Sequence, residues 1–306
     1  MNMALIVNPA SANGNTGRRW KRLEDEIRAE LNTPFSVAMT EEPGHATRLA
    51  RKFISQGIDL IVSAGGDGTH NEVLNGFFDG DRLVNPDAAL AVISLGTGGD
   101  FIRTLGWKKN VAFAIRKIKE RKILKMDVGV AEFLDFAGNP IQRRFLNVVD
   151  FGMGGAVVEK VNRTTKAFGG ALSFLWGILS TLFSYKSPRL IYRLDNGQEQ
   201  SGMLFNFIVG NGRYYGGGIK ATPHAELDDG LLDAVVISEF GRLEAVYNLP
   251  RFRRGDHLDH PKITWARARE IEARCDGTVW IDMDGECVGT LPVRFTILPR
   301  CLNLVV

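Results

Sequence analysis

Short hydrophobic runs alternate with amphipathic patterns along the first part of the chain. The runs that predict buried strands cover residues 4–7, 35–39, 60–64 and 90–95. Apolar side chains recur at helical spacing over residues 18–31, 42–56, 69–78, 101–105 and 111–118. Strands that alternate with helices indicate a parallel sheet with helices on both faces. We therefore predict a doubly wound α/β domain over residues 1–127.

The pattern changes after Asp127. Short strand-like runs separated by turn residues follow at 128–133, 144–149, 190–194, 204–209, 232–238, 262–265 and 279–283. Such runs are typical of an antiparallel sheet or sandwich. We predict a β-rich domain over residues 128–292, and we expect residues 293–306 to turn back and complete the first domain.

The most apolar segment, residues 171–183, is flanked by basic residues and contains Gly177. Because the segment is short for a membrane span, we expect no transmembrane segment. We interpret it as a buried or groove-lining helix, and a helix beside a lipid entry route, with Trp176 near the head groups, is the alternative. A basic cluster at Arg251, Arg253 and Arg254 is interpreted as a solvated face, and a membrane contact is the alternative.

The composition is that of a globular protein large enough for two domains. A formal charge of +3 over 306 residues is too small to favour nucleic acid as a partner. Cys275, Cys287 and Cys301 come late in the chain and lack the spacing of metal ligands. With no secretory signal in the sequence, they predict free thiols in a reducing, cytoplasmic interior.

Three of the predicted parallel strands end in loops rich in Gly, Asn and Thr, at residues 8–17, 65–69 and 96–100. The carboxyl ends of parallel strands meet at one sheet edge, where ligands bind. Glycines let a ligand approach the main chain, and the N–H groups that begin a helix can face a phosphate. Neither the P-loop nor the dinucleotide-binding glycine pattern is present. We predict a phosphate-binding edge, with tight turns that hold no ligand as the alternative.

Asp67 stands inside the glycine loop at residues 65–69. Because a bare carboxylate repels a triphosphate, we expect either a metal ion between the two or a role as a base. A turn in the β-rich half gathers four more acids, Glu226, Asp228, Asp229 and Asp233. Such a turn could hold Mg²⁺ with carboxylates, main-chain carbonyls and water, and solvated acids are the alternative.

The segment at residues 281–286 indicates an acidic site more clearly than that turn does. If its strand persists, Asp282, Asp284 and Glu286 share one face, because side chains alternate along a strand. Three neighbouring carboxylates repel one another, which predicts a bound cation or a raised pKa. A carboxylate with a raised pKa is suited to deprotonating an alcohol.

With these residues laid out, the chain resembles the diacylglycerol kinase catalytic-domain family of lipid kinases, including its soluble bacterial members, over nearly its whole length. The resemblance is carried by Asn8 and Pro9, residues 65–69 with Asn71 and Glu72, residues 96–101, residues 227–231, and Asp284-Gly285-Glu286. The first glycine motif is shared with NAD kinases and phosphofructokinases. Residues 96–101 together with residues 284–286 favour the lipid branch.

The resemblance implies an ATP-binding, doubly wound domain, a β-rich second domain, and an active site between them. Nucleotide contacts are implied for Asn8, Pro9, Ala10, Ser11, Ala12, Thr40, Gly66, Asp67, Gly68, Thr69, His70, Asn71, Glu72 and Thr97. Glu286 would be the proton acceptor with Asp284 beside it, and Asp67 would hold the catalytic Mg²⁺ or share the role of base. A second, structural Mg²⁺ would sit on Asp229 and the main-chain carbonyls of Glu226 and Leu231, linked through water to Asp127.

The chain departs from the family pattern at two positions. Family members usually have Asn before the acid at position 100, and this chain has Gly99. The first loop also has Ala12 where the family pattern has Gly. Both changes bear on the geometry of a glycine-rich loop.

We predict an ATP- and Mg²⁺-dependent lipid kinase that transfers the γ-phosphoryl group to a lipid hydroxyl at the membrane surface. Diacylglycerol, a sphingoid base, ceramide and another glycerolipid all remain open as acceptors, with diacylglycerol or a related lipid preferred. The alternatives are an NAD kinase and a non-catalytic lipid- or nucleotide-binding regulator. We expect a cytoplasmic protein that associates peripherally with membranes and binds no nucleic acid. The sequence leaves the oligomeric state open, a homodimer included.

Overall fold

The computed structural model describes residues 2–164, 180–182 and 184–306. The apolar segment at residues 171–183 therefore lies, apart from residues 180–182, outside the described residues. Within the described part of the chain, we find no helix that is both long and apolar enough to cross a membrane.

The N-terminal half is built on a parallel sheet. In it, β1 (Met3–Val7) lies between β2 (Ser36–Met39) and β3 (Leu60–Gly65), and β6 (Ala89–Ser94) follows β3. All three pairings are parallel. Every residue of β1 and β3 is buried, because helices cover both faces of the sheet.

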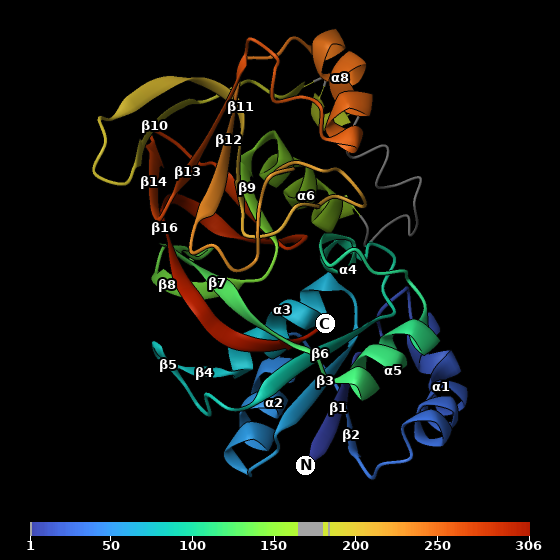
Figure 1. Cartoon of the computed structure of the whole chain (residues 1–306). Coiled ribbons are helices and arrows are strands. Elements are labelled where there is room, and N and C mark those ends of the chain that lie inside the picture. Colours follow the sequence, from blue (N-terminus) through green and yellow to red (C-terminus); the bar gives the residue numbers. More distant parts are fainter. Residues whose placement is uncertain (1, 165–179, 183) are drawn as a thin grey trace.

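The helices of this half divide between the two faces of the sheet (Figure 1). Helices α1 (Asn15–Leu31) and α5 (Val111–Glu120) share one hydrophobic core with the sheet, and α2 (His45–Ser55) and α3 (Asp67–Gly76) share the other. The short helix α4 (Asp100–Thr104) follows β6, and a small hairpin joins β4 (Phe78–Asp79) to β5 (Arg82–Leu83). The predicted doubly wound α/β class is confirmed.

The C-terminal half is rich in strands and largely antiparallel. Its strands are β7 (Ile123–Leu134), β8 (Pro140–Phe145), β9 (Val148–Gly152), β10 (Arg189–Leu194), β11 (Gln200–Gly210), β12 (Leu232–Ser238), β13 (Ile263–Ala268), β14 (Glu270–Cys275), β15 (Trp280–Met283) and β16 (Glu286–Val305). Pairing runs from β11 through β10, β14, β16, β15 and β9 and returns to β11, so these strands enclose a core. In that core the rings of Phe151, Phe207 and Phe295 stack. The prediction of a β-rich second domain is confirmed.

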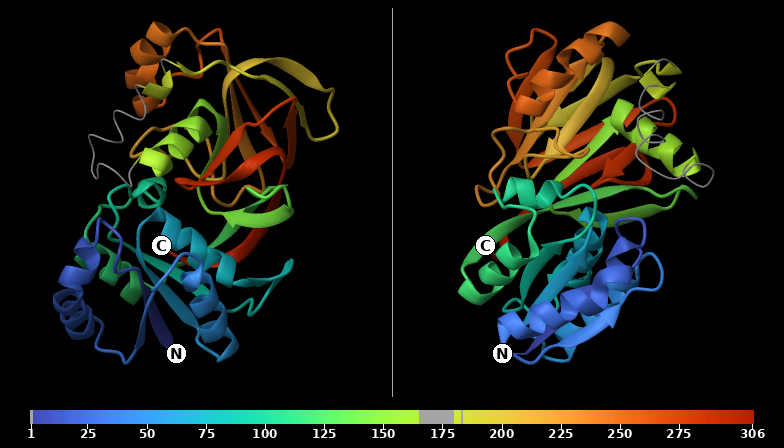
Figure 2. Two further views of the ribbon diagram at one scale, coloured as in Figure 1. Left: turned by 180° about the vertical axis from the view of Figure 1, so that it is seen from behind. Right: turned by 90° about the vertical axis from the view of Figure 1, so that its right-hand side faces the viewer.

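Strand β16 belongs to both halves of the molecule. It begins in a hairpin with β15, continues beside β14 and β7, and ends with Asn303 and Leu304 paired in parallel with β6. One continuous 14-stranded sheet therefore runs through the protein. Figure 2 shows the two halves in contact along this sheet. The domain limits at residues 127 and 292 stay a prediction.

The sequence pattern is wrong about one strand and misses two helices and a strand of the C-terminal half. Residues 144–149, expected as one strand, form the end of β8 and the start of β9, with a break at Leu146 and Asn147. Helices α6 (Met153–Thr164) and α8 (Arg242–Arg254) and strand β14 are not predicted at all. The break has a local cause, because the amides of Leu146 and Asn147 turn toward the carboxylate of Asp284 instead of a neighbouring strand.

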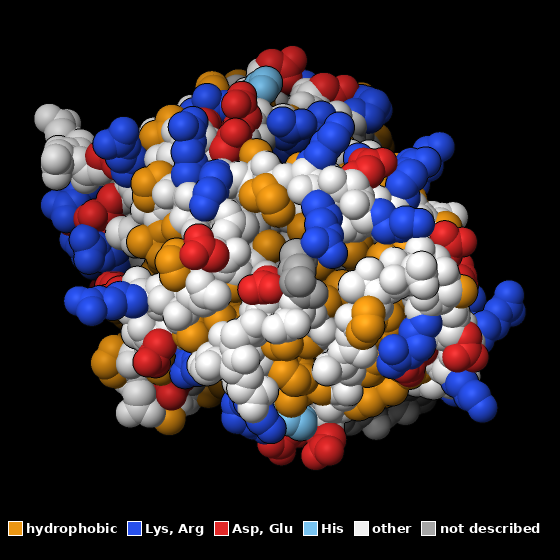
Figure 3. All heavy atoms as spheres, turned by 60° about the horizontal axis from the view of Figure 1, so that its bottom comes forward, with side chains coloured by type: hydrophobic (Ala, Val, Ile, Leu, Met, Phe, Trp, Pro, Cys, Tyr) orange, Lys and Arg blue, Asp and Glu red, His pale blue; other side chains and the backbone are white. Residues whose placement is uncertain are grey.

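The surface charge is mixed, in keeping with the small net charge. On the face shown in Figure 3, basic and acidic side chains alternate, and neither sign forms a continuous stripe. The three cysteines are free thiols and each is partly buried.

The first glycine-rich loop contains a strained backbone at Ala12. Its φ angle is 53°, in the left-handed region, and Asn13 and Gly14 follow at 55° and 77°. A left-handed conformation costs an alanine about 1 kcal/mol relative to glycine. We expect Ala12→Gly to raise the free energy of unfolding by roughly 0.5 kcal/mol, after the added flexibility of the unfolded chain is subtracted. Urea denaturation measures this change.

The matched control is Ala10→Gly, because Ala10 lies in the same loop and is not among the residues with positive φ. That substitution should lower the free energy of unfolding. Equal effects of the two substitutions would contradict the assignment of strain to Ala12.

Candidate active site

The glycine loops after β3 and β6 are in direct contact. The amides of Leu95 and Gly96 both donate to the carbonyl of Gly65, at 2.7 and 3.0 Å. A Cβ atom built on Gly96 would lie 2.5 Å from the Cα of Gly66, so no larger residue fits at position 96 without moving the main chain. The convergence predicted from the topology therefore brings residues 65–69 and 96–100 together at one sheet edge.

The first loop joins the same edge. The Asn8 side-chain amide donates to the Thr69 hydroxyl at 3.0 Å, and the Asn8 side-chain oxygen accepts from the Ala10 amide. The Ser11 hydroxyl donates to the Asn8 carbonyl, and the Thr40 amide donates to the carbonyl of Val7. Pro9 packs against Gly17, where a Cβ atom would lie 3.0 Å away. Asn8 thus contacts the first turn of α3, and Ala10, Ser11 and Thr40 are hydrogen-bonded to Asn8 or to Val7 beside it.

Asp67 fastens the two glycine loops to each other. Its carboxylate accepts hydrogen bonds from the amides of Gly99, Asp100 and Phe101, at 2.8, 3.2 and 3.1 Å. These are the N–H groups at the start of α4, which lack partners within the helix. Gly99 has a φ of 75°, so the position requires a residue that tolerates the left-handed region. Glycine and asparagine both do, which explains how Gly99 replaces the usual Asn.

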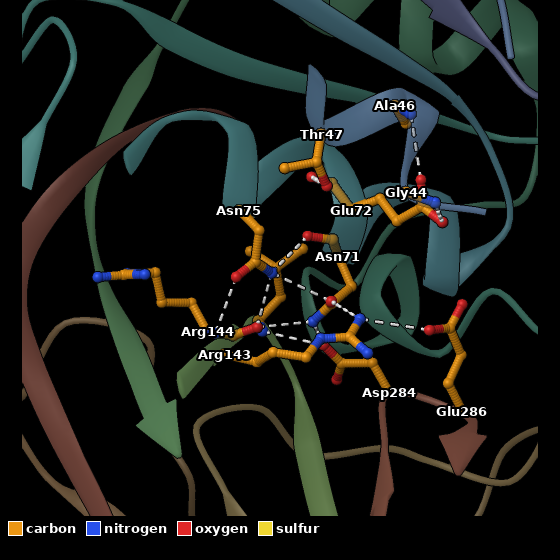
Figure 4. A network of polar contacts seen from close by, with 11 residues as sticks. Gly44, Ala46, Thr47, Asn71, Glu72, Asn75, Arg143, Arg144, Asp284 and Glu286 are labelled. Carbon is orange, nitrogen blue, oxygen red and sulfur yellow. Dashed lines mark hydrogen bonds and ion pairs between the residues drawn. The ribbon is translucent and has the colours of Figure 1, made fainter. Parts of the chain in front are cut away.

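Three residues of α3 predicted as nucleotide contacts direct their side chains elsewhere. The Glu72 carboxylate accepts from the amides of Gly44 and Ala46 at the start of α2, at 2.8 and 3.1 Å (Figure 4). His70 is fully buried against the Ser63 hydroxyl, at 2.7 Å, and burial lowers its pKa to about 4. Asn71 is also buried and faces the β-rich half. Nucleotide contacts by these side chains stay a prediction that the geometry does not favour.

Thr97 lies at the exposed tip of the second glycine loop. Its carbonyl accepts from the Lys109 ammonium at 3.0 Å, and the same ammonium also contacts the carbonyl of Gly96. Lys109 therefore holds this loop in place, a contribution that sequence reasoning missed.

The acidic segment of the β-rich half is a hairpin. Strand β15 ends at Met283, and Asp284 and Gly285 form a two-residue turn with φ angles of 49° and 90° before β16 begins at Glu286. The prediction that Asp282, Asp284 and Glu286 share one strand face is therefore wrong. Positive φ at both turn residues is the geometry for which Asp-Gly is favoured in hairpins.

Asp284 holds the hairpin against both halves of the molecule. Its two carboxylate oxygens accept from the amides of Leu146, Asn147 and Val148 at 3.0 to 3.1 Å. They also accept from the Asn71 side chain at 2.8 Å. Burial raises the pKa of Asp284 to about 6, while the hydrogen bonds from Asn71 and the amides lower it. These four donors anchor the hairpin through Asp284, and the catalytic role predicted for Asp284 stays a prediction.

Glu286 is the acid that faces the glycine loops. A Cβ atom built on Gly68 would lie 2.5 Å from its Oε1 atom, which places the carboxylate directly over the first turn of α3. Its side chain is 41 % exposed, and its Oε2 atom is 3.3 Å from the guanidinium of Arg143. The same guanidinium donates to the Asn71 side-chain oxygen at 3.0 Å (Figure 4). Arg143 thus fixes Glu286 to the network around Asp284.

A second link crosses between the halves at Asp100. Its carboxylate accepts from the Arg103 guanidinium at 2.7 Å and from the Gly217 amide at 2.8 Å. Gly217 lies in a run of three glycines, residues 216–218, that all have positive φ. Burial raises the pKa of Asp100, and the Gly217 amide opposes that rise. Such a glycine run is a signal for a loop that approaches another backbone closely, and it could have been found in the sequence.

The acids of the turn at residues 225–233 lie away from Glu286, beside Asp127. The oxygens of Asp127 accept from the amides of Gly230 and Arg300, at 2.7 and 2.6 Å. In Asp229, Oδ1 accepts from the Leu231 amide at 3.0 Å, and Oδ2 is buried without a hydrogen-bond donor, 3.5 Å from the Arg267 guanidinium.

A buried carboxylate oxygen without a hydrogen-bond donor, such as Oδ2 of Asp229, is suited to bind a cation. Across the described residues, no three His, Cys, Asp or Glu side chains converge on a point where they could hold a metal ion. A Mg²⁺ ion here would therefore depend on Asp229, main-chain carbonyls and water.

Two more acids lie buried behind the hairpin. Asp150 of β9 and Asp282 of β15 stand opposite each other in the strand register, and one oxygen of each has no hydrogen-bond partner. The other Asp150 oxygen accepts from the Asn206 side chain at 2.7 Å. Burial raises the pKa of Asp150 to about 7. Burial also raises the pKa of Asp282 well above its ordinary value, with the charge of Asp150 as a second cause. Near neutral pH the pair therefore holds at least one proton.

This pair makes the stability depend on pH. A folded-state pKa of about 7 for Asp150, against 3.8 for the unfolded chain, gives a stabilising contribution that is complete below about pH 4 and lost as the pH rises through about 7. We expect Asp150→Asn to flatten this dependence and to exceed the wild type in stability by on the order of 2 kcal/mol at about pH 9. Urea denaturation at a series of pH values tests this, and an unchanged slope in the variant would contradict it.

Comparison with known proteins agrees with this architecture. Residues 2–131 match the family model of the diacylglycerol kinase catalytic domain, and residues 147–306 match the YegS C-terminal NAD kinase beta sandwich-like domain. The chain is 28 % identical to the diacylglycerol kinase of Staphylococcus haemolyticus over 303 residues, which cover 98 % of this chain and 86 % of that protein. It is also 28 % identical to the Staphylococcus saprophyticus diacylglycerol kinase, with 98 % and 93 % covered.

Solved structures show the same fold. A Bacillus anthracis strain Sterne protein assigned to the diacylglycerol kinases superposes with a TM-score of 0.76 at 26 % identity, over 99 % of this chain and 96 % of that one. Yeast NADH kinase in complex with NADH superposes with a TM-score of 0.51 at 11 % identity, over 99 % and 82 %. The second likeness concerns the fold alone.

The fold thus combines an N-terminal domain of the diacylglycerol kinase catalytic type with a C-terminal NAD kinase beta sandwich-like domain. The chain belongs to the diacylglycerol kinase catalytic-domain family, and it is an enzyme of the lipid kinase class. The resemblance stated from its motifs is confirmed.

Proposed function

We propose that this protein is an ATP- and Mg²⁺-dependent kinase that phosphorylates the hydroxyl group of diacylglycerol or a related lipid. The observation that carries the proposal is the position of Glu286. Its partly exposed carboxylate lies over Gly68, where the start of α3 offers N–H groups without helical partners. A phosphate bound there would stand next to a group able to accept a proton.

The nucleotide site would be formed by the three loops. The phosphates would lie among the main-chain N–H groups of Gly66 to Thr69, with the loops at Asn8 to Ala12 and at Thr97 on either side, and the positive end of α3 would favour their charge. Asp67 would keep the second loop in position through its three amide contacts. Mg²⁺ bound with ATP would neutralise part of the charge on the phosphates.

Glu286 is a better proton acceptor than Asp284 for a physical reason. Asp284 is buried and accepts four N–H donors, so a lipid hydroxyl has no free side from which to approach it. Glu286 has one contact at 3.3 Å, to Arg143, and 41 % of its side chain is exposed. In the proposed reaction Glu286 accepts the hydroxyl proton while the lipid oxygen attacks the γ-phosphorus, the bond from that phosphorus to the β–γ bridging oxygen breaks, and ADP leaves. Asp284 and Arg143 hold the carboxylate in place.

We also propose a structural metal site, a division of the chain into two domains and a place of action in the cell. A structural Mg²⁺ would be held by Asp229 with the carbonyls of Glu226 and Leu231, where the Oδ2 atom of Asp229 accepts no hydrogen bond from the described residues and lies 3.5 Å from the Arg267 guanidinium. Residues 1–127, completed by the strand end at residues 293–306, would form the nucleotide domain, and residues 128–292 the lipid domain. The protein would act from the cytoplasm at the membrane surface.

The test is transfer of label from [γ-³²P]ATP in the presence of Mg²⁺. Diacylglycerol, a sphingoid base, ceramide, a total lipid extract and NAD are offered separately, and the product is identified by its mass. Labelled phosphatidic acid, or another phosphorylated lipid, is the expected result. Labelled NADP in place of lipid would replace the proposal with an NAD kinase, and ligand binding without any turnover would indicate a regulator.

A further inference from the structure

Helix α8 has its apolar side chains on the outside. Among the described residues, nine large hydrophobic side chains are exposed, and four of them lie on this one helix. They are Leu243, Val246, Tyr247 and Leu249, with exposures of 86, 52, 81 and 42 %. The other five are scattered over separate elements. A contiguous exposed apolar patch marks an interaction site rather than ordinary surface.

The inner face of α8 shows that this orientation is built into the fold. Ala245 and Phe252 pack against the core that contains Ile237 and Phe240. The Asn248 side chain is buried and donates to the Glu244 carbonyl at 2.9 Å. The Glu244 carboxylate accepts from the Gly241 amide and from the Lys262 ammonium. The helix cannot rotate its apolar side chains inward without breaking these contacts.

The outward positions form a single stripe that contains cations and no acid. At 100° per residue, the stripe comprises Arg242, Leu243, Val246, Tyr247, Leu249, Pro250, Arg253 and Arg254. We call these residues the α8 outer face. Three nearby carboxylates are paired within the protein: Glu244 pairs with Lys262, Asp256 with Arg254, and Asp259 with Arg251. Glu239, which precedes the helix, is exposed. For Arg253, the described part of the chain offers no ion-pair partner.

The position of α8 in the molecule makes the α8 outer face accessible to a planar surface. The helix lies at the outer end of the β-rich half, at the top in Figure 1, and the rear and side views in Figure 2 show it at that end as well. A planar surface can therefore approach it without meeting the α/β half first.

We propose that the α8 outer face docks onto an anionic lipid bilayer. The chemistry of the stripe matches the interface of such a membrane: Leu243, Val246 and Leu249 enter the acyl boundary, Tyr247 stands at the head-group level, and Arg253 meets lipid phosphates. This inference rests on the proposed function, because it describes how a kinase of a membrane lipid reaches its substrate. It also replaces the interpretation of the cluster at residues 251–254 as a purely solvated face.

Vesicle flotation tests the docking without any need for catalysis. The full chain is mixed with vesicles of phosphatidylcholine, with and without phosphatidylglycerol. We expect the wild type to bind the anionic vesicles, and the double variant Leu243→Ser/Tyr247→Ser to have a partition coefficient lower by about tenfold or more. A matched control, Ile123→Ser/Phe136→Ser, removes two exposed apolar side chains from other elements and should bind as the wild type does. Arg253→Glu should weaken binding to anionic vesicles more than to neutral ones.

Two outcomes would overturn the proposal. One is equal vesicle binding by the wild type and the α8 double variant, or no binding by either. The other is a wild-type dimer in analytical ultracentrifugation that the double variant abolishes while vesicle binding is unchanged, which would assign the stripe to a second copy of the chain.

Turnover assays separate this inference from the proposed function. If the protein phosphorylates a short-chain diacylglycerol in detergent micelles, and the α8 double variant retains that turnover but loses turnover on vesicles, both proposals stand. Vesicle binding through α8 without transfer to any lipid would contradict the proposed function and support the docking proposal. Transfer in micelles with equal vesicle binding by both proteins would end the docking and leave the function intact.

Discussion

Replacing Glu286 with Gln is expected to reduce kcat for lipid phosphorylation by about 100-fold or more, because an amide cannot accept the hydroxyl proton in the transition state. Gln keeps the size of the side chain and can still accept a hydrogen bond from Arg143, so the fold should be retained. KM for ATP should change little, since Glu286 approaches the loops from the β-rich half. Steady-state kinetics with the acceptor identified by the transfer assay gives both constants.

Three further variants make this result interpretable. Glu26→Gln changes an exposed acid on α1 and should leave kcat unchanged. Gly68→Ala adds a methyl group 2.5 Å from the present position of the Glu286 Oε1 atom, so the carboxylate must move while the backbone stays. We expect that variant to fold normally and to lose activity by about tenfold or more, whereas Gly202→Ala, where the new methyl group meets nothing closer than 3.7 Å, should have no effect. Full activity of Glu286→Gln would remove this residue from the proposed chemistry.

Asp284→Asn is expected to lower the free energy of unfolding by about 3 kcal/mol at about pH 8, where the wild-type carboxylate is ionised. Four N–H donors point at this carboxylate. An Asn side chain offers one oxygen and turns an NH₂ group toward the remaining donors, which leaves them buried without acceptors. Urea denaturation measures the loss.

The activity of Asp284→Asn should fall together with its stability, since the hairpin that carries Glu286 is anchored at Asn71 through Asp284. The matched substitution Asp25→Asn, at an exposed acid on α1, should leave both properties unchanged. If Asp284→Asn is as stable as the wild type and only its activity is lost, Asp284 takes part in the chemistry and is more than a positioning residue.

The sheet edge was predictable because local signals and topology agreed there. The buried runs that became β1, β3 and β6 end in loops whose glycines serve close packing, as Gly96 against Gly66 demonstrates. Parallel strands then place the three loop ends together, whatever the details of the side chains. That is why the region around Asn8, Gly66 and Thr97 could be located without coordinates, although the side-chain directions of His70, Asn71 and Glu72 could not.

The hairpin at Asp284 and Gly285 had a local signal that the strand pattern concealed. Asp-Gly between alternating apolar residues favours a two-residue turn, and a turn removes the period of two on which a shared face depends. Arg143 offered no comparable signal. Its contact with Glu286 joins residues that are 143 positions apart in the chain, and only the pairing of β8 with β7 and of β7 with β16 brings them together.

Helix α8 could not be predicted from periodicity for a different reason. Pattern reasoning assumes that apolar side chains face the core. In α8 four large apolar side chains face outward, whereas Phe252 packs inward and Asn248 is buried. Pro250 inside the helix further weakens the helical signal. A sequence that contradicts the expected pattern in this way points to a surface with a partner.

Strand β16 limits how the two halves can move. The strand that starts with Glu286 ends in the parallel sheet, and it is paired with β7 for most of the distance between. A hinge motion that separates the two halves would require this ladder of paired strands to break or bend sharply. The loops at residues 8–17, 96–100 and 216–218 can shift without disturbing the ladder. Entry of substrates and exit of products should therefore proceed by loop displacement around a stiff frame. The distance between Glu286 and the glycine loops after β3 and β6 should stay nearly constant during turnover.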